Sequence, residues 1–165
     1  MKTVTRLTIN PANSVITSGF GKIDYCDTYC IVQATNDTVE EVAAKIFKWE
    51  KWVDWLMVIR DLVVGVFGLK TGKKIVKGQT VIFPIIEQRE NEIVMGENDK
   101  HLDFRASVLV DRDNSFIYLT TIVHYHNFFG RLYFLPVKPF HKIIVKSSLK
   151  RYKKQIYKDV AFIQL

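Results

Sequence analysis

The side chains best suited to binding chemistry lie in one stretch, HLDFRASVLVDRDNSFIYLTTIVHYH, residues 101–126. Polar residues alternate there with apolar ones, and they include His101, Asp103, Arg105 and His124. Arginine can hold a carboxylate or phosphate through paired hydrogen bonds, and imidazole can donate or accept beside it. The question is whether these side chains line a binding cavity or face water.

The period of two predicts a β-hairpin that turns at DRDN. With Arg112 and Asp113 at the tip, residues whose numbers sum to about 225 should lie opposite each other. One face then carries His101, Asp103, Arg105, Ser107, Tyr118, Thr120, Ile122 and His124. The other face carries Leu102, Phe104, Ala106, Val108, Leu119, Thr121, Val123 and Tyr125. The second face is more apolar, so we expect it to meet a helix.

Three interpretations of the polar face remain open. It is the solvated side of the sheet, where Asp103 and Arg105 form weak surface pairs. Alternatively, the sheet curves and these residues form the polar floor of a cavity, with Arg105 holding a ligand carboxylate or phosphate. The third is a metal site built from His101, Asp103, His124 and His126, although no close third histidine follows from their spacing.

The elements that must position the hairpin begin with a strand over residues 21–34. A helix follows, with Asp37 or Thr38 as its cap and acidic residues in its first turn. A second helix is predicted over residues 51–67, because large apolar residues recur there at steps of three and four.

Four strand-like runs separated by turns come next, as in an antiparallel meander. The last helix should begin at Gly130 or Pro139 and end near Tyr152, with Pro136 and Pro139 breaking or kinking its first part. This order predicts an α+β fold, in which a curved antiparallel sheet wraps a long C-terminal helix.

The 165 residues, 48% of them hydrophobic, predict a single domain over 1–165, with 1–22 as a loosely ordered or edge leader. No apolar run reaches the roughly 18 residues of a membrane span, and the N-terminus has no signal-peptide pattern. We therefore expect a soluble, cytoplasmic protein. Cys26 and Cys30 should be free thiols, because four strand residues separate them by roughly 13 Å.

The net charge of +7 belongs to the C-terminal end, since residues 131–158 hold nine basic residues and no acid. Lys138, Lys142, Lys146 and Lys150 recur at four-residue steps and should form one stripe. Such a stripe is either a solvated helix face or a contact for phosphates or an anionic membrane surface. We expect neither nucleic-acid binding nor stable membrane anchoring.

Three blocks in the sequence, WVDWLMVIRDLVVGVFGLKT, GENDKHLDFRASV and TTIVHYHNFFGRLYFLPVKPFHKIIV, follow one another over residues 52–145. They resemble an uncharacterised bacterial family, domain of unknown function 2867. That family is grouped with the helix-grip superfamily, which includes proteins similar to the birch-pollen allergen and lipid-transfer domains. The resemblance implies a helix-grip fold and a cavity for an apolar or amphipathic small molecule, but it implies no reaction.

We therefore expect a non-catalytic binder or carrier of a small hydrophobic or amphipathic ligand, with no cofactor. Its polar contacts would come from His101, Asp103, Arg105 and His124, and its walls from Trp52, Trp55, Phe104, Tyr118 and Phe140. One alternative is a cyclase, hydratase or isomerase that uses the same cavity, and another is an interaction module that uses the basic helix. His141 is expected at the surface, with the cavity rim as its alternative place.

Overall fold

The computed structural model describes residues 4–7, 11, 13–48 and 83–163, the last six of these as backbone only. Its elements are β1 (Thr5–Leu7), β2 (Tyr25–Val32), α1 (Val39–Ile46), β3 (Ile85–Gln88), β4 (Glu92–Asn98), β5 (Leu102–Asp111), β6 (Phe116–Tyr125) and α3 (Phe128–Ile163). The predicted helix over 51–67 lies outside the described residues. The observed order confirms the expected α+β class, with an antiparallel sheet and a long C-terminal helix.

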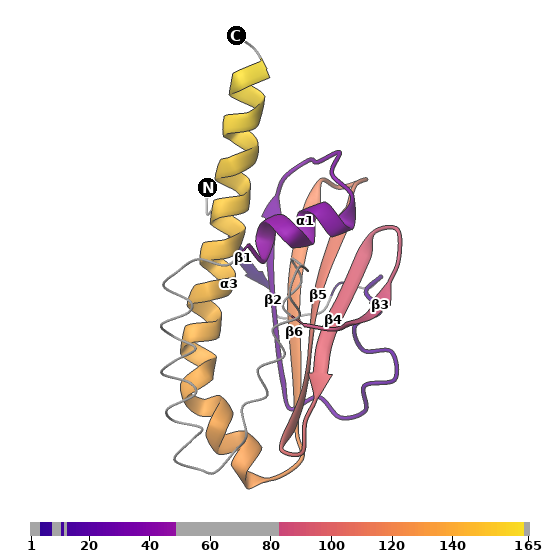
Figure 1. The fold of residues 1–165 in the computed structure, drawn as a ribbon, viewed down its shortest axis with the longest axis vertical. Helices are drawn as coiled ribbons and strands as arrows, with labels where there is room; N and C mark the ends of the chain where they lie inside the picture. Colours follow the sequence, from indigo (N-terminus) through magenta and orange to yellow (C-terminus); the bar gives the residue numbers. More distant parts are fainter. Residues whose placement is uncertain (1–3, 8–10, 12, 49–82, 164–165) are drawn as a thin grey trace.

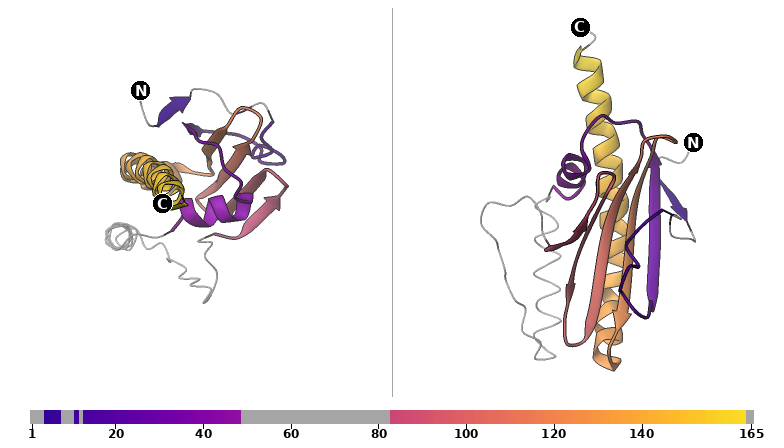
Figure 2. Two further views of the ribbon diagram at one scale, coloured as in Figure 1. Left: turned by 90° about the horizontal axis from the view of Figure 1, so that it is seen from above. Right: turned by 90° about the vertical axis from the view of Figure 1, so that its right-hand side faces the viewer.

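The six strands form one antiparallel sheet in the order β1-β2-β6-β5-β4-β3. Helices α1 and α3 cover the same face of this sheet, which we call the inner face (Figures 1 and 2). α3 lies against β2 and β6, while α1 contacts β4, β5 and α3. The inner face carries the odd residues of β2 and β6 and the even residues of β5, as the apolar alternation of the hairpin predicts.

The β5–β6 hairpin pairs in a register two residues away from the predicted one. Asp103 lies opposite His124 and Arg105 opposite Ile122, so that paired numbers sum to 227. The predicted pairing of Asp103 with Ile122 is therefore wrong. The cause is a turn of four residues instead of two, in which the Asp111 side chain accepts the backbone N–H of Asn114 at 3.0 Å. A shift of two preserves the period, so each residue stays on its predicted face.

Helix α1 begins where its sequence signals place it. Thr38 is the N-cap, and its hydroxyl accepts the backbone N–H of Glu41 at 3.3 Å. The Glu41 carboxylate in turn accepts the backbone N–H of Thr38 at 2.9 Å, which completes a capping box. The buried side of the helix carries Val39, Val42 and Ile46.

Helix α3 is longer than predicted at both ends. Asn127 caps its start, because the side-chain oxygen accepts the backbone N–H of Gly130 at 3.1 Å. The helix continues through Pro136 and Pro139, so these residues do not break it. The expected start at Gly130 or Pro139 and the expected end near Tyr152 are wrong. Both prolines lie on the exposed side, where water can satisfy the carbonyls that lose a helical partner.

Candidate polar site between the sheet and the C-terminal helix

The side chains that the sequence nominated for one cavity lie on different surfaces. Asp103, Arg105, Tyr118 and His124 belong to the outer face of the sheet, which points away from α3, whereas Phe104 belongs to the inner face. His101 lies at the corner between β6 and α3, where its ring Nδ1 is 3.3 Å from the Asn127 side-chain oxygen. Phe140 is 40% exposed on α3. Trp52 and Trp55 are outside the described residues.

Arg105 fastens the segment that precedes β2 onto the outer face. Its Nη1 donates to the backbone carbonyl of Ile16 at 3.1 Å and to that of Ser18 at 2.6 Å. The guanidinium also lies over the Phe20 ring, 5.0 Å from its centroid. Ile16 and Phe20 are buried against Val94 and Ile122 in a small apolar cluster. Part of the leader is thus packed on the sheet, and Arg105 holds it there.

A buried carboxylate, Glu92, holds the same segment at its other end. Glu92 accepts the hydroxyl of Ser14 at 2.6 Å and the backbone N–H of Val15 at 2.8 Å, and it also bonds Ser107. Glu92 is 1% exposed, so each of these bonds compensates the loss of water around its charge. The sequence places Glu92 in a strand but does not indicate its partners, which lie 77 and 78 residues earlier in the chain.

Two histidine–aspartate pairs lie near the end of β6. His124 Nδ1 is 2.8 Å from Asp24 Oδ2, and His126 Nε2 is 3.0 Å from Asp103 Oδ1. Asp24 also accepts the backbone N–H of Tyr125 at 2.9 Å and pairs with Lys22. The bond from the Tyr125 backbone, followed by the bond from Lys22, lowers the pKa of Asp24 well below its usual range.

A second polar cluster lies on the inner face, beneath α3. Asp27 of β2 is only 2% exposed and points toward the helix. Its Oδ2 accepts the hydroxyl of Tyr25 at 2.6 Å, and its Oδ1 lies 3.3 Å from Nε2 of His141. The sheet thus supplies a carboxylate and a phenol, and the helix supplies an imidazole. We call these three residues the inner polar site.

Burial controls the protonation of the phenol in this site. Loss of water around Tyr25, followed by its bond to the Asp27 carboxylate, raises the pKa of Tyr25 far above its usual value. Tyr25 is therefore a neutral hydrogen-bond donor at physiological pH. His141 was expected at the surface, and its contact with Asp27 places it instead at the edge of the interface between helix and sheet.

A further phenol next to the inner polar site has an unused hydroxyl. Tyr29, two residues along β2, is 1% exposed, and its hydroxyl has no hydrogen-bond partner among the described residues. Burial and then the nearby Asp27 charge raise the pKa of Tyr29, so this hydroxyl is also neutral. A buried hydroxyl without a partner is costly, and a ligand hydroxyl or a water would satisfy it.

Small side chains lie beside Asp27 in the sheet. The pairing register places Thr121 opposite Asp27 and Ala106 opposite Thr121. The next row in one direction carries Tyr29, Leu119 and Val108, and the next row in the other direction carries Tyr25, Val123 and Phe104. Asp27 thus begins a row whose two central residues are smaller than their neighbours above and below.

Lysines from the predicted basic stripe approach the same part of β2. The Nζ atom of Lys138 is 4.9 Å from the centroid of the Tyr25 ring, and that of Lys146 is 5.7 Å from the centroid of Tyr29. Two of the four lysines therefore reach back over the rim of the inner polar site.

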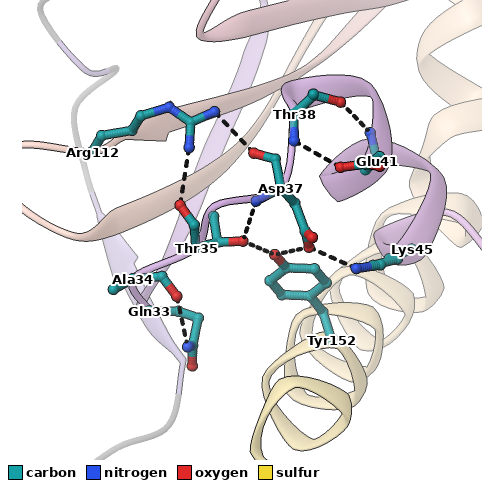
Figure 3. A network of polar contacts seen from close by, with 9 residues as sticks. All are labelled: Gln33, Ala34, Thr35, Asp37, Thr38, Glu41, Lys45, Arg112 and Tyr152. Atoms are coloured by element: carbon teal, nitrogen blue, oxygen red, sulfur yellow. Dashed lines mark hydrogen bonds and ion pairs between the residues drawn. The ribbon is translucent and has the colours of Figure 1, made fainter. Parts of the chain in front are cut away.

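A separate network ties α3, at Tyr152, to the connection between β2 and α1 (Figure 3). The Tyr152 hydroxyl bonds Thr35 at 3.2 Å and Asp37 at 3.3 Å, and Lys45 pairs with Asp37 at 2.7 Å. Burial alone would raise the pKa of Asp37, but the bonds and charge of Lys45, with help from Tyr152, lower it overall. The polar groups of this network bond to one another, so we infer that the network stabilises the fold.

Two further observations concern metals and membranes. Among the described residues, no three histidine, cysteine, aspartate or glutamate side chains converge as metal ligands would. In the same part of the chain, no helix combines the length and apolar character needed to cross a bilayer. Cys26 and Cys30 are unpaired, as their spacing predicts.

The fold and the inner polar site together define an α+β protein in which one polar cluster is enclosed between an antiparallel sheet and its C-terminal helix. The chain belongs to the family described as protein of unknown function (DUF2867), whose model matches residues 20–148. This match confirms the family that the three sequence blocks resemble. No curated protein and no solved structure matches the chain.

The inner polar site lay within reach of sequence reasoning, but the signal was overlooked. On β2, Tyr25, Asp27, Tyr29 and Ile31 share one face by period two. Asp27 is the single acid among aromatic and apolar residues on that face. A lone acid on a face that packs on a helix requires partners, which is the signal that could have identified it.

Proposed function

We propose that the protein binds a small amphipathic molecule between the inner face of the sheet and α3, in the manner of helix-grip proteins. The observation that carries this proposal is the buried Asp27 carboxylate, which faces α3 with partners from both the sheet and the helix. The unused Tyr29 hydroxyl adds a second point of attachment. The ligand therefore meets Asp27 instead of Arg105, to which the sequence had assigned this role.

The chemistry of the site favours a ligand with a hydroxyl group. An alcohol can donate to Asp27 and accept from Tyr29, whereas a carboxylate would place a second negative charge next to Asp27. The apolar part of the ligand would lie along the small residues Ala106 and Thr121, toward the aromatic cluster that includes Phe104 and Phe134. The apolar contact supplies affinity and the hydroxyl contact supplies orientation.

Native mass spectrometry of the freshly purified protein, compared with its denatured mass, tests for a retained ligand. Titration with decan-1-ol and with decanoate then tests the preference for a hydroxyl. We expect the alcohol to bind more tightly, and Asp27→Asn to weaken its binding by about ten-fold. Asp103→Asn is the matched control, because it makes the same change on the outer face and should leave binding unchanged.

Equal loss of affinity in the two variants, or tighter binding of decanoate, would contradict the proposed site.

A second candidate function, acid–base catalysis, is favoured by the pairing of His141 with Asp27. With Nε2 directed at Asp27, Nδ1 is the atom that would exchange a proton with a ligand. His141→Gln would then abolish conversion of the retained ligand while its binding persists.

A further inference from the structure

The side of α3 that faces away from the sheet has two chemically distinct halves. Its first half, up to residue 143, exposes large apolar side chains: Phe128, Phe129, Leu135, Phe140 and Ile143. Its second half exposes Lys150 and Lys154. At 3.6 residues per turn these residues fall on one side of the helix, and the apolar half is about 22 Å long. We call this side the outer α3 surface.

The exposure of the apolar half is unusual for a surface in contact with water alone. Phe128 is 71% exposed and Leu135 is 62% exposed, and both lie on the same side of the helix. Scattered apolar residues on a surface need no explanation, but a contiguous row of them marks an interaction site. Both prolines of the helix lie among them, and the exposed Arg131 flanks the row one turn before Leu135.

The charge around the apolar row indicates what kind of partner binds the outer α3 surface. Residues 131–158 contain nine basic residues and no acid, so the outer α3 surface is positive wherever it is charged. Two copies packed through this surface would bring like charges together, which opposes a dimer. An anionic lipid surface instead offers an apolar boundary for phenylalanine and leucine side chains and phosphates for the lysines.

We propose that the outer α3 surface docks reversibly on anionic membranes. The helix lies along the bilayer surface, with Phe128 and Leu135 at the headgroup boundary and Lys150 above the phosphates. This proposal is independent of the inner polar site, because His141 faces β2 while the docking residues face away from it. It gives the protein a place at which an amphipathic ligand could be collected or delivered.

Flotation of the full chain with lipid vesicles tests the proposal. We expect binding to vesicles of phosphatidylcholine with one third phosphatidylglycerol, and much weaker binding to pure phosphatidylcholine. High salt should reverse the binding, because exposed charges are screened. Absence of binding to the anionic vesicles at low salt would overturn the proposal.

Two variants with matched controls locate the surface. Leu135→Ala should weaken vesicle binding by roughly five-fold, whereas Ile85→Ala, at a residue 48% exposed on the edge strand β3, should not. Lys150→Glu should weaken binding by roughly ten-fold or more at low salt, whereas Arg89→Glu in the β3–β4 turn should have little effect. Circular dichroism establishes that all four variants are folded.

If the outer α3 surface binds something other than a membrane, the binding experiments give different results. Binding to a DNA duplex without binding to vesicles would overturn the lipid assignment in favour of nucleic acid. A doubled mass in light scattering that Leu135→Ala abolishes, again without vesicle binding, would assign the surface to a second copy of the chain. Equal effects of each variant and its control would show that vesicle binding does not use α3.

Discussion

At the scale of single residues, the charged side chains of the sheet are explained by what covers each face. Arg105 and Glu92 hold the segment before β2 on the outer face, and Asp27 meets α3 on the inner face. Three buried or half-buried charges thus have three separate sets of partners. Burial of a charge without such partners would cost several kcal/mol, so the partners identify what each residue does.

Asp24 offers a pH-dependent test of this assignment. Its pKa is lower in the folded chain than in the unfolded one, so its charge stabilises the fold above about pH 4. That contribution is lost as the pH falls below this value, toward the folded-state pKa. Asp24→Asn should therefore lower the free energy of unfolding by about 1–3 kcal/mol near neutral pH, and by less near about pH 3.

Urea denaturation of both proteins at the two pH values measures the difference. Asp113→Asn is the control, because Asp113 lies in the exposed tip of the β5–β6 turn. A loss of stability in Asp24→Asn that is as large at low pH as at neutral pH would show that shape, and not charge, is what matters at this position.

The residue types and their period of two predict which face of the sheet each side chain lies on, but not which groups that side chain contacts. The alternation of residues 102–111 correctly indicates that Phe104 faces a helix and that Arg105 does not. The partners of Arg105 lie 87 and 89 residues earlier in the chain, in a segment without a period of its own. No local pattern indicates which segment will cover an outer face, and this is why Arg105 was assigned to a cavity.

At the scale of elements, the start of α3 is fixed by contact with β5 more than by helix propensity. Gly130 is buried in the first turn, and a Cβ added there would overlap the carbonyl oxygen of His101. That carbonyl also accepts the backbone N–H of His126 at 3.0 Å, so it cannot move freely. The glycine is required because the backbones of helix and strand approach closely.

Two substitutions to alanine in α3 should therefore change stability in opposite directions. Gly130→Ala should destabilise by about 1–3 kcal/mol, although alanine is the better helix former, because the overlap outweighs propensity. Pro136→Ala should stabilise by about 1–3 kcal/mol, because it restores a helical N–H at an exposed position. Thermal unfolding measures both, and stabilisation by Gly130→Ala would contradict the close approach.

The helix and turn signals in the sequence differ in how well they predict the elements. The cap of α1 follows from local chemistry, which predicts Asp37 or Thr38, and Thr38 is the residue that caps the helix. The start of α3 is left open between Gly130 and Pro139 by the sequence because proline is expected to break or kink a helix, whereas Pro136 and Pro139 are tolerated on the solvent side. The hairpin register was missed by two because the bonds of Asp111 within the turn favour four residues.

At the scale of the whole molecule, α3 joins two apolar clusters of the inner face. Phe134 packs with Tyr25 and Val123 near the start of the helix, and Leu149 packs with Ile117 and Ile46 farther along. The inner polar site, with His141, lies between these two contact points on the helix. One continuous helix therefore couples the two ends of the sheet across the inner polar site.

This coupling predicts a single cooperative unfolding transition. Leu149→Ala removes a fully buried side chain and should cost about 2–5 kcal/mol. Because α3 links the clusters, native-state hydrogen exchange should accelerate by a similar factor at Ile117 and at Val123, at opposite ends of β6. Ile143→Ala, on the exposed side of the same helix, should change stability by no more than about 0.5 kcal/mol. Acceleration confined to Ile117 would mean that the two clusters open independently, and that the inner polar site lies at a hinge between them instead of within one rigid unit.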